Sequence, residues 1–183
     1  MQYLLESLDN KLLINHLLFR YKQRSECFRK LELIDLLKKT KTKKNDLEKM
    51  ARTNKEKVLS NDLYLYLHDQ GMDFEIEVQS GSRGRIDFKS KLGIYIGEAK
   101  VFKDDKAYII SGIRQLTGYL AENNVTEGVL PIFNVGTKKL LIEKITLNGY
   151  KITPRVIDLR DETPTVLKNR ENVEISQSDF LEK

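Results

Sequence analysis

The chain has 183 residues, of which 40% are hydrophobic, and this is enough for one folded domain with an apolar core. Charged residues make up 32% of the chain, and the net charge of +5 favours an anionic partner such as nucleic acid. One cysteine excludes an intramolecular disulfide, two histidines argue against a zinc site of Cys and His, and no segment has the apolar length of a membrane span.

The N-terminal part is predicted to be helical. Its first residues lack the basic and apolar runs of a signal peptide, so we expect a cytoplasmic protein. Leucines at helical spacing predict one helix over residues 3–24 and a second over 26–38. Cys27 is expected to be an ordinary buried small residue rather than a nucleophile. A further helix is predicted over 45–69, and Gly71 ends it.

A basic stretch separates the second and third predicted helices. Residues 38–44 hold five lysines in seven positions. The stretch is either a solvated linker or an arm that contacts phosphates by counterion release. The lysines are Lys38, Lys39, Lys41, Lys43 and Lys44.

From residue 72 the hydrophobic period changes from that of a helix to that of a strand. Alternating residues predict strands over 74–79, 85–91 and 93–102, with the last two joined by a turn. Gly97 and Ala99 give one face of the third strand small side chains, and we expect a helix to pack closely against this face. This region is therefore predicted to begin with antiparallel strands.

The remaining elements alternate between helix and strand. Helical spacing predicts a helix over 105–121, and a short apolar run predicts a buried strand over 128–135. Residues 137–149 are predicted to form a helix, although several of them are β-branched, and 150–159 a further strand. The polar tail after Arg160 is expected to be a loop with one short helix.

This order of elements predicts an α/β fold. An antiparallel hairpin that leads into a β-α-β crossover gives a mixed sheet covered by helices. We expect a helical extension over residues 1–45, a core over 46–160 and a tail over 161–183.

The predicted hairpin carries charges at positions where strands pack. Asp87 lies on its first strand, and Glu98 and Lys100 share one face of its second. Folding about residues 91–92 sets Asp87 opposite Ile96, so that Glu98 is its diagonal neighbour at about 7–8 Å between Cβ atoms. Two carboxylates at this separation can bind one Mg²⁺, which takes its other ligands from water and phosphate. Lys100 would then hold or help deprotonate the attacking water, or stabilise charge on the phosphate.

The alternative is a partly buried ion-pair cluster with no chemistry. Buried charges destabilise a fold unless they are paired, and apolar residues often replace them without loss. Such residue types are seldom fully buried, which favours a functional role for this cluster.

The pattern resembles the PD-(D/E)XK nuclease superfamily, which has the restriction-endonuclease-like fold. Ten residues separate Asp87 from the Glu98-Ala99-Lys100 triplet, and Ile86 stands where the family name has proline. Glu98 is the only glutamate in the chain that is followed by lysine two positions later. The surrounding order of helix, strand, "GR-D", strand, helix and strand also fits. The resemblance covers about residues 55–160 and implies this fold for the core.

A second motif lies on the predicted helix after the hairpin. Gln115 and Tyr119, at positions i and i+4, share one helical face. This resembles the QxxxY motif of RecB-like members of the superfamily, whose side chains face the active site and the substrate. The alternative for the pair is an ordinary polar helix flank.

The resemblance implies a set of functional residues. Asp87, Glu98 and the backbone carbonyl of Ala99 would hold Mg²⁺, for which Mn²⁺ can substitute, and Lys100 would orient and activate water. Gln115 and Tyr119 would complete the catalytic set by positioning the substrate strand or the lysine, the arginines Arg83, Arg85 and Arg114 would bind nucleic acid, and the lysines of 38–44 would add phosphate contacts.

The family also often supplies an acidic residue from the helix before the first strand. Glu56 is the best candidate for this further metal ligand, followed by Asp62. Glu75 and Glu77 on the first strand are other options.

The sequence therefore predicts a Mg²⁺-dependent nuclease that hydrolyses phosphodiester bonds, with DNA more expected than RNA as the substrate. Defence, restriction and repair systems all stay open as its setting, as do a homodimer and a larger helicase or defence complex. The first alternative is a non-catalytic nucleic-acid-binding subunit on the same fold. The second is an interaction module that docks through the N-terminal helices. A membrane partner is not expected.

Overall fold

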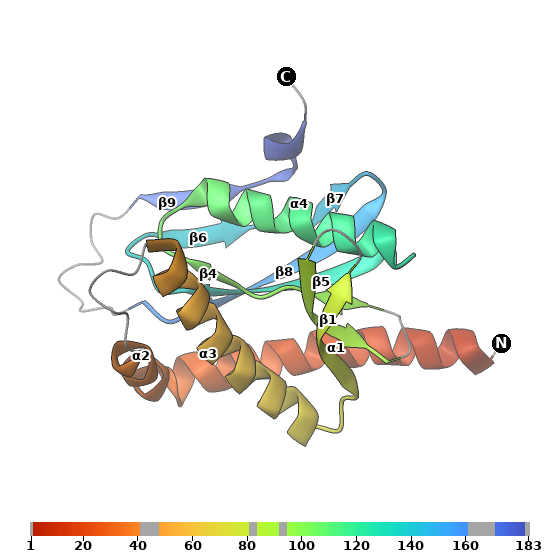
Figure 1. Cartoon of the computed structure of the whole chain (residues 1–183), viewed down its shortest axis with the longest axis horizontal. Helices are drawn as coiled ribbons and strands as arrows, with labels where there is room; N and C mark the ends of the chain where they lie inside the picture. Colours follow the sequence, from red (N-terminus) through yellow and green to blue (C-terminus); the bar gives the residue numbers. More distant parts are fainter. Residues whose placement is uncertain (1, 41–47, 81–83, 92–94, 161–170, 182–183) are drawn as a thin grey trace.

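The computed structural model describes the backbone of residues 2–40, 48–80, 84–91, 95–160 and 171–181, and side chains in these ranges except at 2–11 and 48–53. The fold is α/β, with a mixed seven-stranded sheet flanked by helices, as predicted (Figure 1). No helix in these ranges is both long and apolar enough to cross a membrane.

Three helices precede the sheet, in agreement with the sequence. They are α1 (Gln2–Cys27), α2 (Lys30–Lys39) and α3 (Glu48–Asp69). Each buries one apolar stripe, because leucines and tyrosines recur every three or four residues along it. Residues 41–47 lie outside the described residues, and they include Lys41, Lys43 and Lys44 of the predicted basic stretch.

Cys27 is exposed, so its predicted burial is wrong. It is the last residue of α1 and follows buried Ser25 by two positions. Two positions correspond to roughly 200° around a helix, so Cys27 points away from the buried stripe. The position on the helix therefore outweighs the usual preference of cysteine for the interior.

The strands that follow form the predicted hairpin and crossover. β1 (Phe74–Ser80) pairs antiparallel with β2 (Gly84–Ser90), and β2 pairs antiparallel with β3 (Ile96–Gly97). Both β3 and β4 (Lys100–Phe102) pair with β5 (Glu127–Asn134), in parallel. α4 (Lys106–Glu122) forms the crossover between β4 and β5. The mixed sheet thus follows the predicted connectivity.

The predicted third strand is interrupted at Glu98 and Ala99, between β3 and β4. The N–H of Glu98 donates to the carbonyl of Val129 at 3.2 Å, and a regular parallel ladder would return a bond from residue 131 to the carbonyl of Glu98. Residue 131 is proline and has no N–H to donate. The interruption therefore has a cause in the partner strand.

The small face at Gly97 accommodates a ring and not a helix. A Cβ atom at Gly97 would lie 1.8 Å from Cζ of Phe88, so the Phe88 ring occupies this space. Phe88 is the cross-strand partner of Gly97 in the β2–β3 ladder. At Gly97 an aromatic residue on the neighbouring strand therefore takes the place of the expected helix contact, whereas Ala99 and Val101 on the same face share a core with α1, α2 and α3.

The predicted helix over 137–149 is also wrong. These residues form β6 (Lys139–Ile142) and β7 (Ile145–Leu147). Asn148 and Gly149 have φ values of 52° and 82°, as a two-residue hairpin turn requires, and they join β7 to β8 (Tyr150–Asp158). The β-branched residues and the Asn-Gly pair favour strands over a helix.

The tail contains a strand that was not predicted from the sequence. β9 (Asn172–Ile175) pairs in parallel with β6 to form a second, two-stranded sheet, and a short 3₁₀ helix (Gln177–Phe180) follows. Residues 161–170 lie outside the described residues. The domain boundaries at 45 and 160 stay a prediction.

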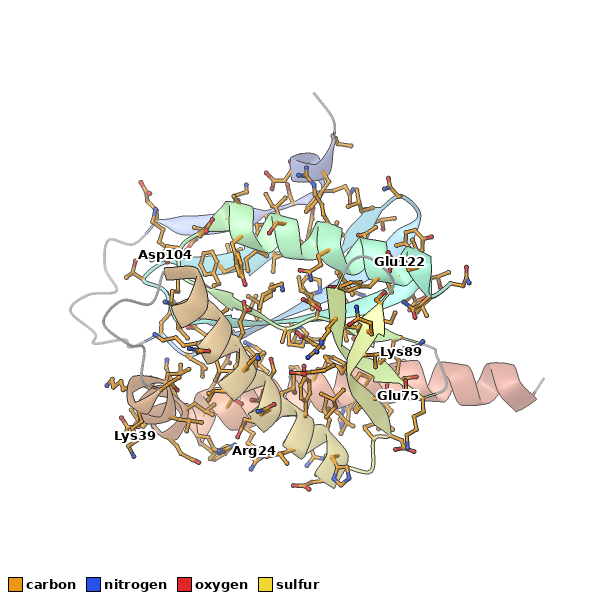
Figure 2. All side chains as sticks on the ribbon, in the orientation of Figure 1. Arg24, Lys39, Glu75, Lys89, Asp104 and Glu122 are labelled. Carbon is orange, nitrogen blue, oxygen red and sulfur yellow. The ribbon has the colours of Figure 1, made fainter. Side chains whose placement is uncertain are left out.

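Two apolar cores lie on opposite sides of the large sheet. One joins α1, α2 and α3 to the sheet, and the other joins α4, β6 and β9 to it. Figure 2 shows the side chains that fill the space between the helices and the strands. The N-terminal helices therefore share a core with the sheet.

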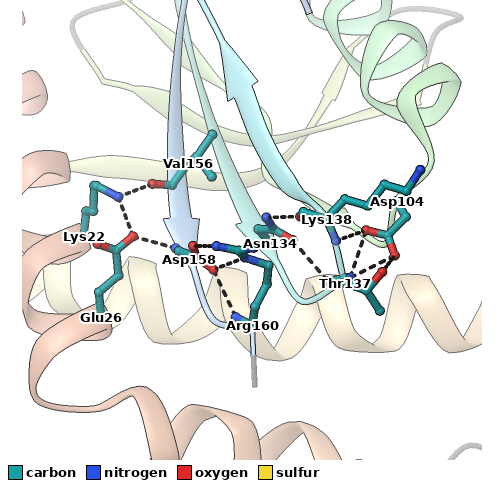
Figure 3. A network of polar contacts seen from close by, with 10 residues as sticks. Lys22, Glu26, Asp104, Asn134, Thr137, Lys138, Val156, Asp158 and Arg160 are labelled. Carbon is teal, nitrogen blue, oxygen red and sulfur yellow. Dashed lines mark hydrogen bonds and ion pairs between the residues drawn. The ribbon is translucent and has the colours of Figure 1, made fainter. Parts of the chain in front are cut away.

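α1 also covers an open edge of β8. β7 pairs with β8 only at its start, from Tyr150 to Ile152. Further along, Lys22 Nζ donates to the carbonyl of Val156 at 2.8 Å, and the N–H of Asp158 donates to Glu26 Oε1 at 2.6 Å (Figure 3). These contacts satisfy backbone groups that a neighbouring strand would otherwise pair.

Candidate active site

A small pocket gathers the charged residues that the sequence singled out. Its volume is about 110 Å³, and it lies between α3, the β1–β2 hairpin and the interruption between β3 and β4. Asp87, Glu98 and Lys100 all line it. We refer to it below as the Glu98 pocket.

The three residues are in close contact. Lys100 Nζ donates to Glu98 Oε1 at 2.7 Å, and the N–H of Ala99 donates to Asp87 Oδ2 at 2.7 Å. The predicted pairing of Asp87 with Ile96 is wrong, because Ile96 pairs with Lys89 and Gly97 with Phe88. Continued by one residue, this register sets Asp87 directly opposite Glu98. The two carboxylates are therefore closer neighbours than the diagonal prediction implied.

Burial controls the electrostatics of the pocket. It raises the pKa of Glu98 to about 7, with Asp87 adding to the effect and Lys100 opposing it. Burial also raises the pKa of Asp87, against the lowering effects of the Ala99 N–H and Lys100. Burial by itself would lower the pKa of Lys100, but the carboxylates of Glu98 and Glu56 raise it above its usual value. Lys100 is therefore an ammonium at neutral pH.

The stem of Lys100 packs against α4. A Cβ atom at Gly112 would lie 2.9 Å from Cε of Lys100, so glycine at this helical position leaves room for the lysine. The Nζ atom lies 5.9 Å from the ring centroid of Tyr108, within the range of a cation–π contact. The side chain of Lys100 is thus held from two sides before any ligand binds.

Glu56, the predicted helix acid, does line the Glu98 pocket. Its Oε1 accepts the N–H of Val101 at 3.0 Å and the hydroxyl of Tyr108. These bonds connect α3 to β4 and α4 beside Lys100. Asp62 instead binds Arg29 at 2.7 Å and Tyr21 at 2.9 Å, away from this pocket. Glu75 is exposed on β1 and does not line the pocket either.

Gln115 and Tyr119 form the expected pair on α4. Gln115 Nε2 donates to the Tyr119 hydroxyl at 2.7 Å, and Tyr119 is buried. A Cβ atom at Gly84 would lie 3.3 Å from that hydroxyl, so the pair packs under the start of β2. Burial raises the pKa of Tyr119, and the Glu98 carboxylate adds to this rise. The pair therefore lies close enough to sense the pocket, although neither residue lines it.

The predicted nucleic-acid-binding residues are spread over the surface. Arg85 is exposed and pairs with Glu77 at 3.1 Å, and Arg114 lines a separate pocket between α4 and the β7–β8 turn. Lys38 and Lys39 are exposed at the end of α2. The other predicted residues, Arg83, Lys41, Lys43 and Lys44, lie outside the described residues.

Several pocket residues were not predicted. Tyr64 and Ser60 project from α3 into the lining, together with Lys57 and Asn61. Burial and the Asp87 carboxylate raise the pKa of Tyr64 far above its ordinary value, so it stays a neutral phenol. The spacing of 57, 60, 61 and 64 is the i, i+3, i+4, i+7 pattern of one helical face. It could have been found from the sequence by following Glu56 along its helix.

Glu77, one of the alternative acidic residues on the first strand, also lines the pocket and has an unusual backbone conformation. Its φ of 51° lies in the left-handed region, which is strained for a residue with a Cβ atom. The kink falls opposite Asp87 in the β1–β2 register and interrupts that ladder. Local strain of this kind is concentrated at functional sites, so Glu77 is added to the candidate residues.

A second polar cluster lies at the carboxyl ends of β4, β5 and β8 (Figure 3). We call it the carboxyl-edge network, and it comprises Asp104, Asn134, Thr137, Lys138, Asp158 and Arg160. Asp104 Oδ1 accepts the N–H of Lys138 at 2.7 Å, and Asp104 Oδ2 accepts the hydroxyl of Thr137 at 2.7 Å. Asp158 binds Arg160 through two bonds of 2.8 and 2.6 Å. The bonds within the network fix the loops that leave these strands.

The Glu98 pocket fits a hard cation in its chemistry. Asp87 and Glu98 supply carboxylate oxygens, and Glu98 Oε2 is buried with no hydrogen-bond partner among the described residues. Those residues contain no group of three Asp, Glu, His or Cys side chains arranged to hold a metal on its own. A Mg²⁺ ion at this position would take its remaining ligands from water and substrate phosphate, as it commonly does.

Comparisons of the chain with protein-family models, curated proteins and solved structures gave no match. A functional assignment therefore depends on the geometry of the residues described above.

Proposed function

We propose that the chain is a metal-dependent nuclease of the PD-(D/E)XK type, with a restriction-endonuclease-like core, that hydrolyses phosphodiester bonds in DNA. The observation that carries the proposal is the meeting of Asp87, Glu98 and Lys100 in one pocket, with one Glu98 oxygen left unpaired. A purely structural ion-pair cluster would pair its buried carboxylate oxygens, as the carboxyl-edge network does.

Each residue has a role that its position supports. Asp87 and Glu98 would hold Mg²⁺, which polarises the phosphate and offsets its charge when bound. Lys100, a protonated amine, would stabilise the charge that builds on the phosphate as water attacks. The water oxygen forms a bond to phosphorus while one phosphorus–ester oxygen bond breaks. A proton passes to the leaving oxygen, and the products are a hydroxyl and a phosphate monoester.

Other residues support binding of the substrate. The Gln115–Tyr119 pair lies on α4 beside the lysine stem, where the family resemblance expects substrate contacts. Lys57 and Asn61 add hydrogen-bond donors at the exposed side of the pocket. Lys38 and Lys39, which are exposed in the last turn of α2, would add phosphate contacts outside the pocket. Phosphate contacts of this kind make affinity fall with salt and carry no base specificity.

The test is a cleavage assay on labelled single- and double-stranded DNA and RNA, with Mg²⁺, Mn²⁺ or EDTA. We expect cleavage of DNA in either metal and none in EDTA. Lys100→Ala should remove cleavage, while Lys144→Ala, which alters an exposed lysine after β6, should not. Equal cleavage by both variants would reject the assignment. Binding without turnover in every metal would instead identify a non-catalytic nucleic-acid-binding subunit.

A further inference from the structure

Two buried polar atoms of the Glu98 pocket have no hydrogen-bond partner among the described residues. They are Glu98 Oε2 and the hydroxyl oxygen of Tyr64, and both side chains line the pocket. Native proteins pair nearly all such atoms with protein groups or ordered water, because a buried unpaired atom has lost its hydration without replacement. Two of them in one pocket indicate a small polar partner.

Both atoms are held in place. The Tyr64 ring packs edge-on against Phe88, with the ring centroids 5.5 Å apart, and Phe88 in turn packs against Phe74 at 5.4 Å. Glu98 is 3% exposed, and its other carboxylate oxygen is occupied by Lys100. The Ser60 hydroxyl lies beside the Tyr64 hydroxyl in the pocket lining and acts on its pKa, but the two do not meet the distance and angle of a hydrogen bond.

A water molecule can supply both missing hydrogen-bond partners, an acceptor for the Tyr64 hydroxyl and a donor for Glu98 Oε2. A phenol donates one hydrogen bond and a carboxylate oxygen accepts one, so a single water can accept from Tyr64 and donate to Glu98. The pocket volume of about 110 Å³ leaves room for this, since a water occupies roughly 30 Å³. The volume is too small for a nucleoside, so the occupant is a small polar molecule.

We propose that the Tyr64 hydroxyl and Glu98 Oε2 together hold a water molecule in the Glu98 pocket. We also assign to Tyr64 the role of a positioning residue that fixes the attacking water, and this second part rests on the proposed nuclease function. The water accepts a hydrogen bond from the Tyr64 hydroxyl and donates one to Glu98 Oε2. Lys100 binds the other oxygen of the same carboxylate, Oε1.

Tyr64→Phe removes only the hydroxyl and keeps the ring contacts. The matched control is Tyr66→Phe, a buried tyrosine on the same helix that packs against Tyr21 and does not line the pocket. Crystal structures of the metal-free wild type and of Tyr64→Phe test the water directly. We expect a water between the two atoms in the wild type and its loss in the variant. A wild-type structure with no water there would overturn the proposal.

Denaturation of the metal-free proteins gives a second readout. Removing a truly unpaired hydroxyl leaves stability unchanged or raises it, whereas removing one that holds a water lowers it. We expect the urea midpoint of Tyr64→Phe to fall below that of the wild type. A midpoint at or above the wild-type value contradicts the water.

Kinetics test the positioning role separately. In Mg²⁺ we expect Tyr64→Phe to lower kcat about ten- to a hundredfold with KM unchanged, and Tyr66→Phe to match the wild type. A wild-type kcat in Tyr64→Phe would overturn the positioning role. If the wild type cleaves no nucleic acid in either metal, the nuclease proposal fails, and the crystal structures and urea midpoints still decide whether the pair holds a water.

Discussion

The Glu98 pocket and the carboxyl-edge network both gather charged residues beside strand ends. They differ in the direction in which they shift the pKa of a carboxyl group and in how many hydrogen bonds its oxygens receive. In the network, burial alone would raise the pKa of Asp104, but bonds from Lys138 and Thr137 lower it below its ordinary value. In the pocket, burial raises the pKa of Glu98 to about 7, and one of its oxygens has no partner among the described residues. Paired carboxylates stabilise the fold, whereas carboxylates left short of partners are available for a ligand.

The comparison also explains why the location of a polar cluster is not enough to assign a site. Carboxyl ends of parallel strands are the usual place for ligands in α/β sheets, which would favour the network. Its acidic groups, however, are occupied by the loops that they anchor. The pocket is smaller, and it lies at an interruption in a strand.

The largest expected effect is on cleavage. Asp87→Asn keeps an acceptor for the Ala99 N–H and removes the charge that would hold the metal. We expect the cleavage rate to fall by at least about 10²-fold. The free energy of unfolding should stay equal or rise, because a buried carboxylate disfavoured by desolvation is lost. Cleavage assays and urea denaturation measure the two effects. Normal cleavage by Asp87→Asn would mean that the charges of the pocket are structural, like those of the network.

The network predicts the reverse result. Asp104→Ala leaves the N–H groups of Thr137 and Lys138 without their acceptor, so we expect a loss of about 2 kcal/mol of stability. Cleavage at a temperature where the variant is folded should be unchanged. Asp73→Ala, which removes an exposed ion pair with Lys91, is the control and should change stability by less than about 0.5 kcal/mol. Reduced cleavage by folded Asp104→Ala would mean that the network belongs to the site.

The two regions should also respond to pH with opposite signs. The pKa of Glu98 rises from an ordinary 4.5 to about 7 on folding, so the folded chain retains a proton that the unfolded chain releases. The stability of the metal-free wild type relative to Glu98→Gln should therefore fall between about pH 4.5 and 7, by at most about 1.4 kcal/mol per pH unit.

Asp104 and Asp158 have lowered pKa values, so their stabilising contribution is present above pH 3.8 and is lost as the pH falls below it. Urea denaturation of the wild type and Glu98→Gln at pH 4, 5.5 and 7 measures the contribution of the pocket. A difference between the two proteins that stays constant over this range would contradict the effect of burial on Glu98.

The smallest effect concerns the strained residue opposite Asp87. Glycine adopts a φ of 51° without strain, and alanine does not. Glu77→Gly should therefore be more stable than Glu77→Ala by about 1 kcal/mol, while both variants lose the same carboxylate. Thermal unfolding compares them. Equal stability would show that the chain at this position relaxes when the side chain is shortened, and that the kink is not imposed by the hairpin.

The sequence predicted what depends on local periodicity and residue type. Helical and alternating patterns correctly located the first three helices, the hairpin, α4, β5 and β8. The motif residues Asp87, Glu98 and Lys100 were brought together as expected, and Glu56 joined them from α3. These features could be predicted because they depend only on the spacing of residues within single helices and strands and across one short turn.

The errors arise where one element depends on another. The break in the third strand requires Pro131 in the neighbouring strand, and the register of Asp87 requires the Phe88 ring to cover Gly97. The helix predicted over 137–149 failed because apolar spacing was given more weight than the Asn148-Gly149 turn. Tyr64 was missed because a buried tyrosine carries no signal until its hydroxyl is seen without a partner.

The side chains of Lys22 and Glu26 on α1 cover the edge of β8, so α1 cannot be removed without exposing that edge. Truncation of α1 would uncover backbone groups along a parallel strand, together with the apolar surface that this helix buries. Such an edge pairs with strands of other molecules, so we expect the shortened protein to aggregate. The first helix is therefore a part of the folded unit that the sheet requires, and it is not a removable appendage.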